Sequence, residues 1–211
     1  MKVAALCFLL LGTLPIAGCA TKKSATDKNF SEALNAYLVN KGRLCLGLAS
    51  KWPIDIDLRD RGTNLGQAPA MAALQKVGLV HSYEGETSYT PLLSDLLSKH
   101  EVLRYELTDE GRQFYREKEY SVPNGPSDVH GDLCYGQEAV DRIVKWEGPM
   151  DLGNYKQVSV FYTYKIEQLA GWVSDPDVRR AFPSVVLTIN SAGQRILTRT
   201  LILTNEGWGA E

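Results

Sequence analysis

A short apolar segment at the N-terminus constrains this chain most, because it limits which residues can belong to the folded protein. Lys2 gives the segment a positive start, residues 3–11 are apolar, and residues 14–18 end in small side chains directly before Cys19. The apolar run is too short to cross a bilayer as a helix, which needs roughly 20 apolar residues. The pattern is typical of a secretion signal, so we expect residues 1–18 to be removed as a signal peptide.

The four residues Ile16-Ala17-Gly18-Cys19 resemble the lipobox of bacterial lipoprotein precursors. In that family the cysteine is diacylated, the peptide is cut before it, and the new amino terminus is acylated. The resemblance implies that Cys19 is lipidated and that its acyl chains anchor the protein in a membrane. Ala20 stands where aspartate tends to retain such proteins in the inner membrane, so the resemblance implies the outer membrane, with the folded part in the periplasm. An ordinary secretion signal with a chance cysteine is the alternative.

Residues 19–29 are expected to form the lipidated cysteine and a flexible tether. Their side chains are mostly small or charged, and they cannot bury enough apolar area to offset the entropy of the chain. Ten extended residues at about 3.3 Å each would let the folded part stand up to roughly 33 Å from the bilayer.

Two cysteines, Cys45 and Cys134, remain in the folded part once Cys7 leaves with the signal peptide and Cys19 carries lipid. An oxidising compartment favours a disulfide between them, and two buried, unpaired thiols are the alternative. Neither cysteine has the C-x-x-C spacing of a redox motif. Catalysis by Cys134 with His130 is disfavoured, because residues four apart on a strand lie about 13 Å apart along it.

Residues 30–120 are predicted to form a mainly helical domain. Apolar residues recur at helical spacing after Asn29, and residues 67–77 form a second such stretch that ends at Gly78. Residues 91–100 add a further predicted helix. Thr108 is the expected N-cap of another, after a short strand.

This half resembles the winged-helix domains of small bacterial regulators over residues 30–118. The resemblance rests on two motifs, at residues 73–80 and 105–112. In that family the helix before the wing lies in the DNA major groove, and here it would be residues 67–77. Lys76 is the only charged side chain of that helix, and the adjoining wing carries Glu84 and Glu86. The attraction to phosphate is therefore missing, and we expect no nucleic-acid partner.

Residues 121–211 are predicted to form an antiparallel α+β domain. The proline and glycine residues of 121–131 indicate a junction, and a period of two follows it. Strands are expected at 131–136 and 139–146, joined by a tight turn at Gly136-Gln137, and then around 158–165, at 185–190 and at 195–204, with a helix at 169–182. The predicted fold class is thus α+β, with a helical winged-helix-like N-terminal half followed by an antiparallel sheet with one or two helices.

Few side chains stand in a pattern that predicts catalysis or metal binding. The candidate metal ligands are the aspartates Asp55, Asp57 and Asp60 and the histidines His81, His100 and His130. Two arginines interrupt the aspartates, and the glycine and distal glutamate of a calcium loop are missing, so a solvated strand face is favoured. The histidines lack a second ligand at metal spacing. We therefore predict no catalytic residues, no metal site and no cofactor.

The composition is typical of a globular protein with a packed core, and the small net charge predicts no overall attraction to nucleic acid or to an anionic membrane surface. Hydrophobic residues make up 44% and charged residues 23%, and the net charge is −2. We expect a non-enzymatic envelope lipoprotein with a binding or structural role, which binds a peptide, glycan or protein partner through a sheet face or edge. The alternative is a hydrolase-like periplasmic enzyme whose site is assembled from residues far apart in the sequence.

Overall fold

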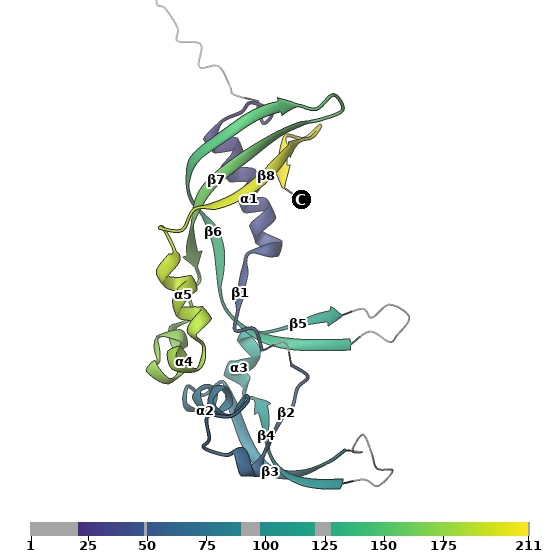
Figure 1. Cartoon of the computed structure of the whole chain (residues 1–211), viewed down its shortest axis with the longest axis vertical. Coiled ribbons are helices and arrows are strands. Elements are labelled where there is room, and N and C mark those ends of the chain that lie inside the picture. The colour runs from purple at the N-terminus through teal and green to yellow at the C-terminus, as the bar shows by residue number, and fades with distance from the viewer. Residues whose placement is uncertain (1–20, 49, 90–97, 121–127, 211) are drawn as a thin grey trace, which may run out of the picture.

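The computed structural model describes residues 21–210 except residue 49, residues 90–97 and residues 121–127. The molecule is elongated, with a curled sheet around one helix at one end and a small sheet with short helices at the other (Figure 1). The helices are α1 (Asp27–Lys41), α2 (Ala68–Lys76), α3 (Asp109–Phe114), α4 (Pro176–Ala181) and α5 (Pro183–Ser191), with 3₁₀ turns at Leu58–Asp60 and Gly171–Ser174. The strands are β1 (Arg43–Cys45), β2 (Ile54–Asp57), β3 (Val80–Tyr89), β4 (Ser98–Leu107), β5 (Tyr115–Tyr120), β6 (Asp128–Asp151), β7 (Lys156–Glu167), β8 (Leu197–Leu203) and β9 (Trp208–Ala210). None of the helices in these described ranges is long and apolar enough to cross a membrane.

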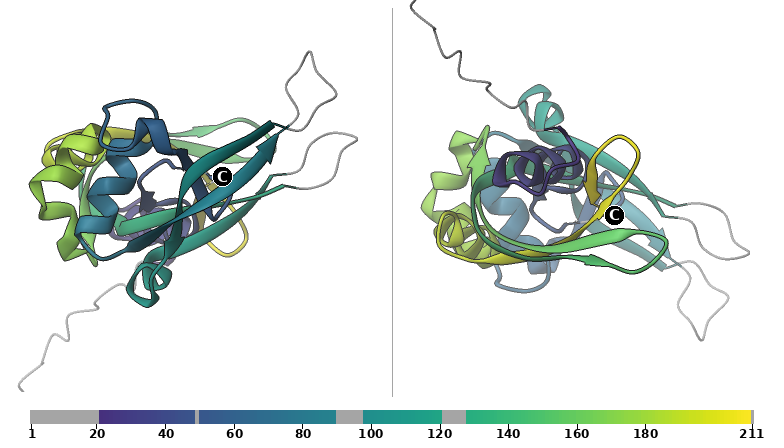
Figure 2. Two further views of the ribbon diagram at one scale, coloured as in Figure 1. Left: turned by 90° about the horizontal axis from the view of Figure 1, so that it is seen from below. Right: turned by 90° about the horizontal axis from the view of Figure 1, so that it is seen from above.

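Helix α1 forms the core of the first end. Thr26 caps it by accepting a hydrogen bond from the backbone N–H of Asn29. Phe30, Leu34 and Leu38 follow at a spacing of four residues, so they share one face of the helix, and all three are buried. Strands β6, β7, β8 and β9 curl around this face (Figures 1 and 2).

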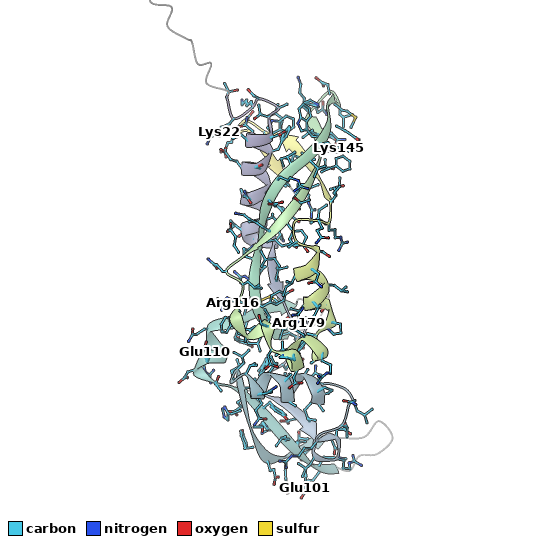
Figure 3. The ribbon with its side chains drawn as sticks, turned by 90° about the vertical axis from the view of Figure 1, so that its left-hand side faces the viewer. Lys22, Glu101, Glu110, Arg116, Lys145 and Arg179 are labelled. Carbon is cyan, nitrogen blue, oxygen red and sulfur yellow. A yellow bond between two sulfur atoms is a disulfide. The ribbon has the colours of Figure 1, made fainter. Side chains whose placement is uncertain are left out.

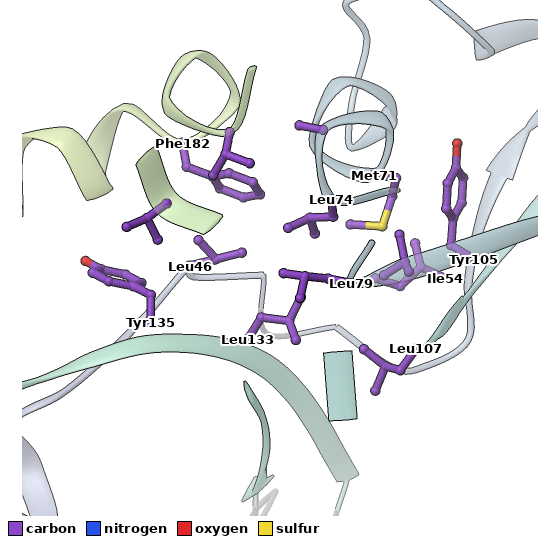
Figure 4. Packing of buried hydrophobic residues seen from close by; sticks show 14 of the residues in the cluster. Leu46, Ile54, Met71, Leu74, Leu79, Tyr105, Leu107, Leu133, Tyr135 and Phe182 are labelled. Atoms are coloured by element: carbon purple, nitrogen blue, oxygen red, sulfur yellow. The ribbon is translucent and has the colours of Figure 1, made fainter. Parts of the chain in front are cut away.

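The second end has its own core beneath the three-stranded sheet, whose order is β2-β4-β3. Met71 and Leu74 of α2 pack with Leu79 against this sheet, and Phe182 joins them from the C-terminal helices (Figure 4). Leu133 comes from β6 and is fully buried in the same cluster. Elements from both halves of the sequence therefore build this core.

Strand β6 runs through both ends of the molecule. It pairs with β5 over its first residues, with β1 at its middle and with β7 over the remainder. Cys134 lies opposite Cys45 of β1, and the two form a disulfide. The predicted disulfide is confirmed.

The predicted fold class, with its helical winged-helix-like half over residues 30–120, is wrong. That stretch holds β1 to β5, which are five of the nine strands in the described ranges. Strands β3 and β4 pair along ten residues each, and an ion pair between Glu86 and Lys99 (Oε2–Nζ 3.0 Å) spans them. Of the helix predicted at 91–100, residues 98–100 belong to β4, and the others lie outside the described residues.

Two further predictions fail in the C-terminal half. The turn expected at residues 136–137 is absent, because β6 continues through it. Gly136 instead allows close packing, since a Cβ there would come within 2.8 Å of the Cγ2 of Ile166. The strand expected at residues 185–190 is part of α5, whose first-turn Pro183 favours a helical start and whose Val185 is buried in the core.

The two halves that the sequence suggested, 30–120 and 121–211, share both cores. Helix α1 packs against the sheet of the C-terminal half, and α2 packs against α4. The stretch expected to be a junction connects two paired strands, with Tyr120 of β5 opposite Asp128 of β6. Residues 121–127 themselves lie outside the described ranges.

The described part of the expected tether is fastened to the body. The buried side chain of Asn29 donates hydrogen bonds to the carbonyl oxygens of Thr21 (2.9 Å) and Ser24 (2.8 Å). The indole N–H of Trp208 donates to the same oxygen of Ser24 at 3.2 Å. Residues 21–29 therefore form part of the folded protein, because its core supplies donors for their backbone. Cys19 and Ala20 lie outside the described residues.

We predict that replacing both Cys45 and Cys134 by serine lowers the free energy of unfolding. The bond joins residues 89 apart in the sequence, and closing a loop of that length stabilises a chain by roughly 2–5 kcal/mol. Equilibrium unfolding in guanidinium chloride measures the change. Unmodified protein treated with reductant is the matched control and should unfold at the same midpoint as the variant. A variant as stable as the oxidised protein would contradict this account.

Candidate functional site

One face of the three-stranded sheet carries charged and aromatic side chains, and we call it the polar face. Side chains alternate between the two faces of a strand, and Ile54, Leu103 and Tyr105 take the face that meets the core. Most of the residues on the opposite face form the polar face: Asp55 and Asp57 of β2, His81 and Tyr83 of β3, and His100, Arg104 and Glu106 of β4. The buried Val102 lies on the same face, between His100 and Arg104. Strands β3 and β4 stand in the foreground when the molecule is viewed from this end (Figure 2, left).

Cross-strand contacts connect the centre of the polar face. The guanidinium of Arg104 donates two hydrogen bonds to the carboxylate of Asp55, from Nε (2.7 Å) and Nη2 (2.6 Å). The hydroxyl of Tyr83 donates to Oε1 of Glu106 at 2.8 Å. The ring of His81 stacks on that of Tyr83 with centroids 6.5 Å apart. The arrangement presents side chains whose positions are fixed by pairing across three strands.

The remaining aspartate of β2 is engaged by its neighbours. Asp57 accepts hydrogen bonds from Nε (2.9 Å) and Nη2 (2.6 Å) of Arg59. Nδ1 of His100 lies 3.5 Å from Oδ2 of the same carboxylate. Two of the three aspartates of the acidic cluster, Asp55 and Asp57, are thus paired with arginine on one face of the strand, whereas Asp60 lies in the 3₁₀ turn that follows it.

The perturbed pKa values on this face move away from neutral pH. The hydrogen bond to Glu106 raises the pKa of Tyr83, and the hydrogen bonds from Arg59 hold the pKa of Asp57 well below its usual range. The carboxylate of Asp55 raises the pKa of Arg104. A general acid or base works best with a pKa near the working pH, so these three groups suit recognition by fixed charge and hydrogen bonding.

Tyr83 places an aromatic ring on the polar face where solvent can reach it. Its side chain is 44% exposed, and it lies on the edge strand β3, where its hydroxyl donates a hydrogen bond to Glu106 of the central strand. Tyrosine combines a rigid ring with a polar end, which is why it is enriched at the centres of protein interfaces.

A shallow groove of about 570 Å³ lies beside α2 and α4 at the same end of the molecule. Small side chains line most of it, among them Ala68, Ala72 and Ala181. Lys76 of α2 forms ion pairs with Asp175 and Asp177 across the helix contact. These ion pairs connect α2 to α4, so the charged side chains at the groove have a structural role that requires no ligand.

The structure brings some of the candidate residues of the sequence together and separates others. Cys45 and Cys134 are bonded, whereas Cys19 lies outside the described residues. Nε2 of His130 lies 3.1 Å from Oδ2 of Asp128. Within the described part of the chain, no three His, Cys, Asp or Glu side chains gather as metal ligands.

Sequence reasoning missed the polar face as a unit. Its signal was a repeat of polar residues two positions apart in three segments: Asp55 and Asp57, His81 and Tyr83, and Arg104 and Glu106. Such spacing predicts one face of a strand, but the register that places the segments side by side requires the structure.

Comparisons with protein families, with characterised proteins and with solved structures find nothing similar to this chain.

We predict that Glu106→Gln lowers the pKa of Tyr83 towards the ordinary tyrosine value. A carboxylate beside the hydroxyl stabilises the protonated phenol and repels the phenolate, and the neutral amide removes this repulsion. Titration of the Tyr83 ring carbon by NMR measures the change. Glu110→Gln is the control, because Glu110 contacts Gln113 on α3 and should leave Tyr83 unaffected. An unchanged pKa in Glu106→Gln would show that the hydrogen bond does not form in solution.

Proposed function

We propose that this protein is a lipid-anchored lipoprotein of the bacterial envelope, held in the outer membrane by acyl chains on Cys19, that binds a protein partner in the periplasm through its polar face. The order of apolar run, lipobox and cysteine supports the anchor. The bond between Cys45 and Cys134 is what an oxidising compartment favours. The role is binding rather than catalysis.

One observation carries the proposal: the polar face and the start of the fold lie at opposite ends of the long axis. Lys22 marks one end and Glu101 of β4 the other in Figure 3. A chain anchored just before Thr21 would hold the polar face at the end of the body away from the bilayer. A partner dissolved in the periplasm or attached to another envelope layer could reach it there.

The chemistry of the face favours a protein surface over a nucleic acid or a simple ion. Positive and negative groups alternate across it, as Arg104 and Arg59 lie among Asp55, Asp57 and Glu106, so it attracts neither polyanions nor polycations strongly. Alternating charges around an exposed tyrosine fit a partner with the complementary pattern. Peptide and glycan partners are the other classes expected from the sequence.

A photo-crosslinking phenylalanine derivative in place of Tyr83 tests this proposal in intact envelopes. We predict one discrete protein adduct that is absent when Arg104 and Asp55 are also replaced by alanine. The matched control places the same derivative at Leu187 of α5, which is 69% exposed on the flank of the body. Equal adducts at both positions, or no adduct at Tyr83 in membrane-bound protein, would contradict the role assigned to the polar face.

A further inference from the structure

The fastened N-terminal residues limit how far the body can lie from its anchor. Asn29 and Trp208 hold the carbonyl oxygens of Thr21 and Ser24, so Thr21 has a fixed place on the body. Cys19 precedes Thr21 by two residues, and at no more than about 3.6 Å per residue the two Cα atoms lie within roughly 7 Å. An acyl group on Cys19 would therefore bring this end of the body down to the lipid headgroups, in place of the standoff of a free tether.

The hairpin between β6 and β7 reaches this same end of the molecule (Figure 1). We call its turn, residues 150–156, the apical tip. Three of its side chains are apolar or aromatic and strongly exposed: Met150 (47%), Leu152 (47%) and Tyr155 (43%). Lys23, just after the fastened Thr21, lines a shallow groove together with Tyr155 and Leu203, so the tip adjoins the place where the chain leaves the body.

The charges around the apical tip do not oppose a lipid surface. Lys156 lies 3.6 Å from Asp151, and Lys145 lies 2.6 Å from Glu147, so these two acidic groups are paired. Two more acids lie at this end: Asp27 accepts a hydrogen bond from the indole of Trp146, and Glu206 is exposed in the turn between β8 and β9. Lys22 and Lys23 add positive charge at the same end, where Figure 3 labels Lys22 and Lys145. Exposed aliphatic side chains, a tyrosine and nearby lysines are typical of protein surfaces that lie at a membrane interface.

We infer that the apical tip is a membrane-contact surface, and that Met150, Leu152 and Tyr155 enter the periplasmic leaflet beside the acyl chains of Cys19. This inference rests on the proposed anchor. The acyl chains and the apical tip would give the protein two contacts with the bilayer. Two contacts fix the orientation of the body relative to the membrane, whereas an acyl anchor alone leaves it free to tilt. The body then stands with α1 towards the lipid and the polar face away from it.

Depth-dependent quenching tests the inference on the mature, acylated chain in vesicles of phosphatidylethanolamine and phosphatidylglycerol. A bimane label on Leu152→Cys should lose most of its fluorescence when the vesicles carry a nitroxide quencher in the upper acyl chain. The same label on Ser88→Cys in β3, at the opposite end, should keep its fluorescence. Adding Met150→Asp to the labelled Leu152→Cys protein should reduce the quenching, because a charged side chain resists entry into the leaflet.

Flotation of the same samples separates this inference from the proposed function. Acylated chain should float with the vesicles, and Cys19→Ser should not. Failure of the acylated chain to float would overturn the anchor and the membrane contact together. The acylated chain could float while the label at position 152 is quenched no more than the label at position 88. That result would support the acyl anchor and overturn only the membrane contact of the apical tip.

Discussion

The continuity of strand β6 is the constraint on which the rest of this structure depends. Its early residues Leu133 and Tyr135 are buried in the core beneath the small sheet, and Val140 is buried in the core around α1. Full burial of one such aliphatic side chain contributes roughly 1.5–3 kcal/mol. Because one strand supplies both cores, neither can move relative to the other without bending that strand or exposing part of its apolar surface.

A close strand contact and a disulfide lie on β6 between the two cores. Gly136 lies against Ile166 of β7, and the Cβ of any larger residue would clash with the Cγ2 of Ile166. Two positions earlier, Cys134 is bonded to Cys45, which fixes the connection from α1 at the same level. The molecule therefore behaves as one elongated body, and its two ends can carry different tasks. The proposed tasks follow from chemistry: exposed apolar residues near Thr21 suit lipid, and paired charges on the far sheet suit a protein surface.

The sequence predicted those features that depend on local chemistry. Thr108 caps α3 as expected, and α1 buries the face that its apolar spacing indicated. The pairing of Cys45 with Cys134, 89 residues apart, was predicted instead from the compartment and from the absence of other cysteines in the folded part. The failures share a cause, which is that tertiary packing decided the outcome. Gly136 was interpreted as a turn, although the same residue type also permits close approach of two strands.

The other errors have the same origin. The β-branched residues of 185–190 favour a strand locally, yet burial of Val185 and the position of Pro183 make them helical. The polar residues 21–29 have little apolar area of their own, but the donors of Asn29 and Trp208 hold their backbone. The polar face depended on the register of three strands, which no single segment encodes.

The central claim is that β6 makes the two ends one rigid body, and a distance distribution between them tests it directly. Spin labels at Lys28 of α1 and Gln75 of α2, both exposed on packed helices, report that distance by pulsed electron spin resonance. The account predicts a single narrow distribution that stays unchanged when the mature protein is bound to vesicles. A broad or two-peaked distribution would show that the ends move independently and would contradict it.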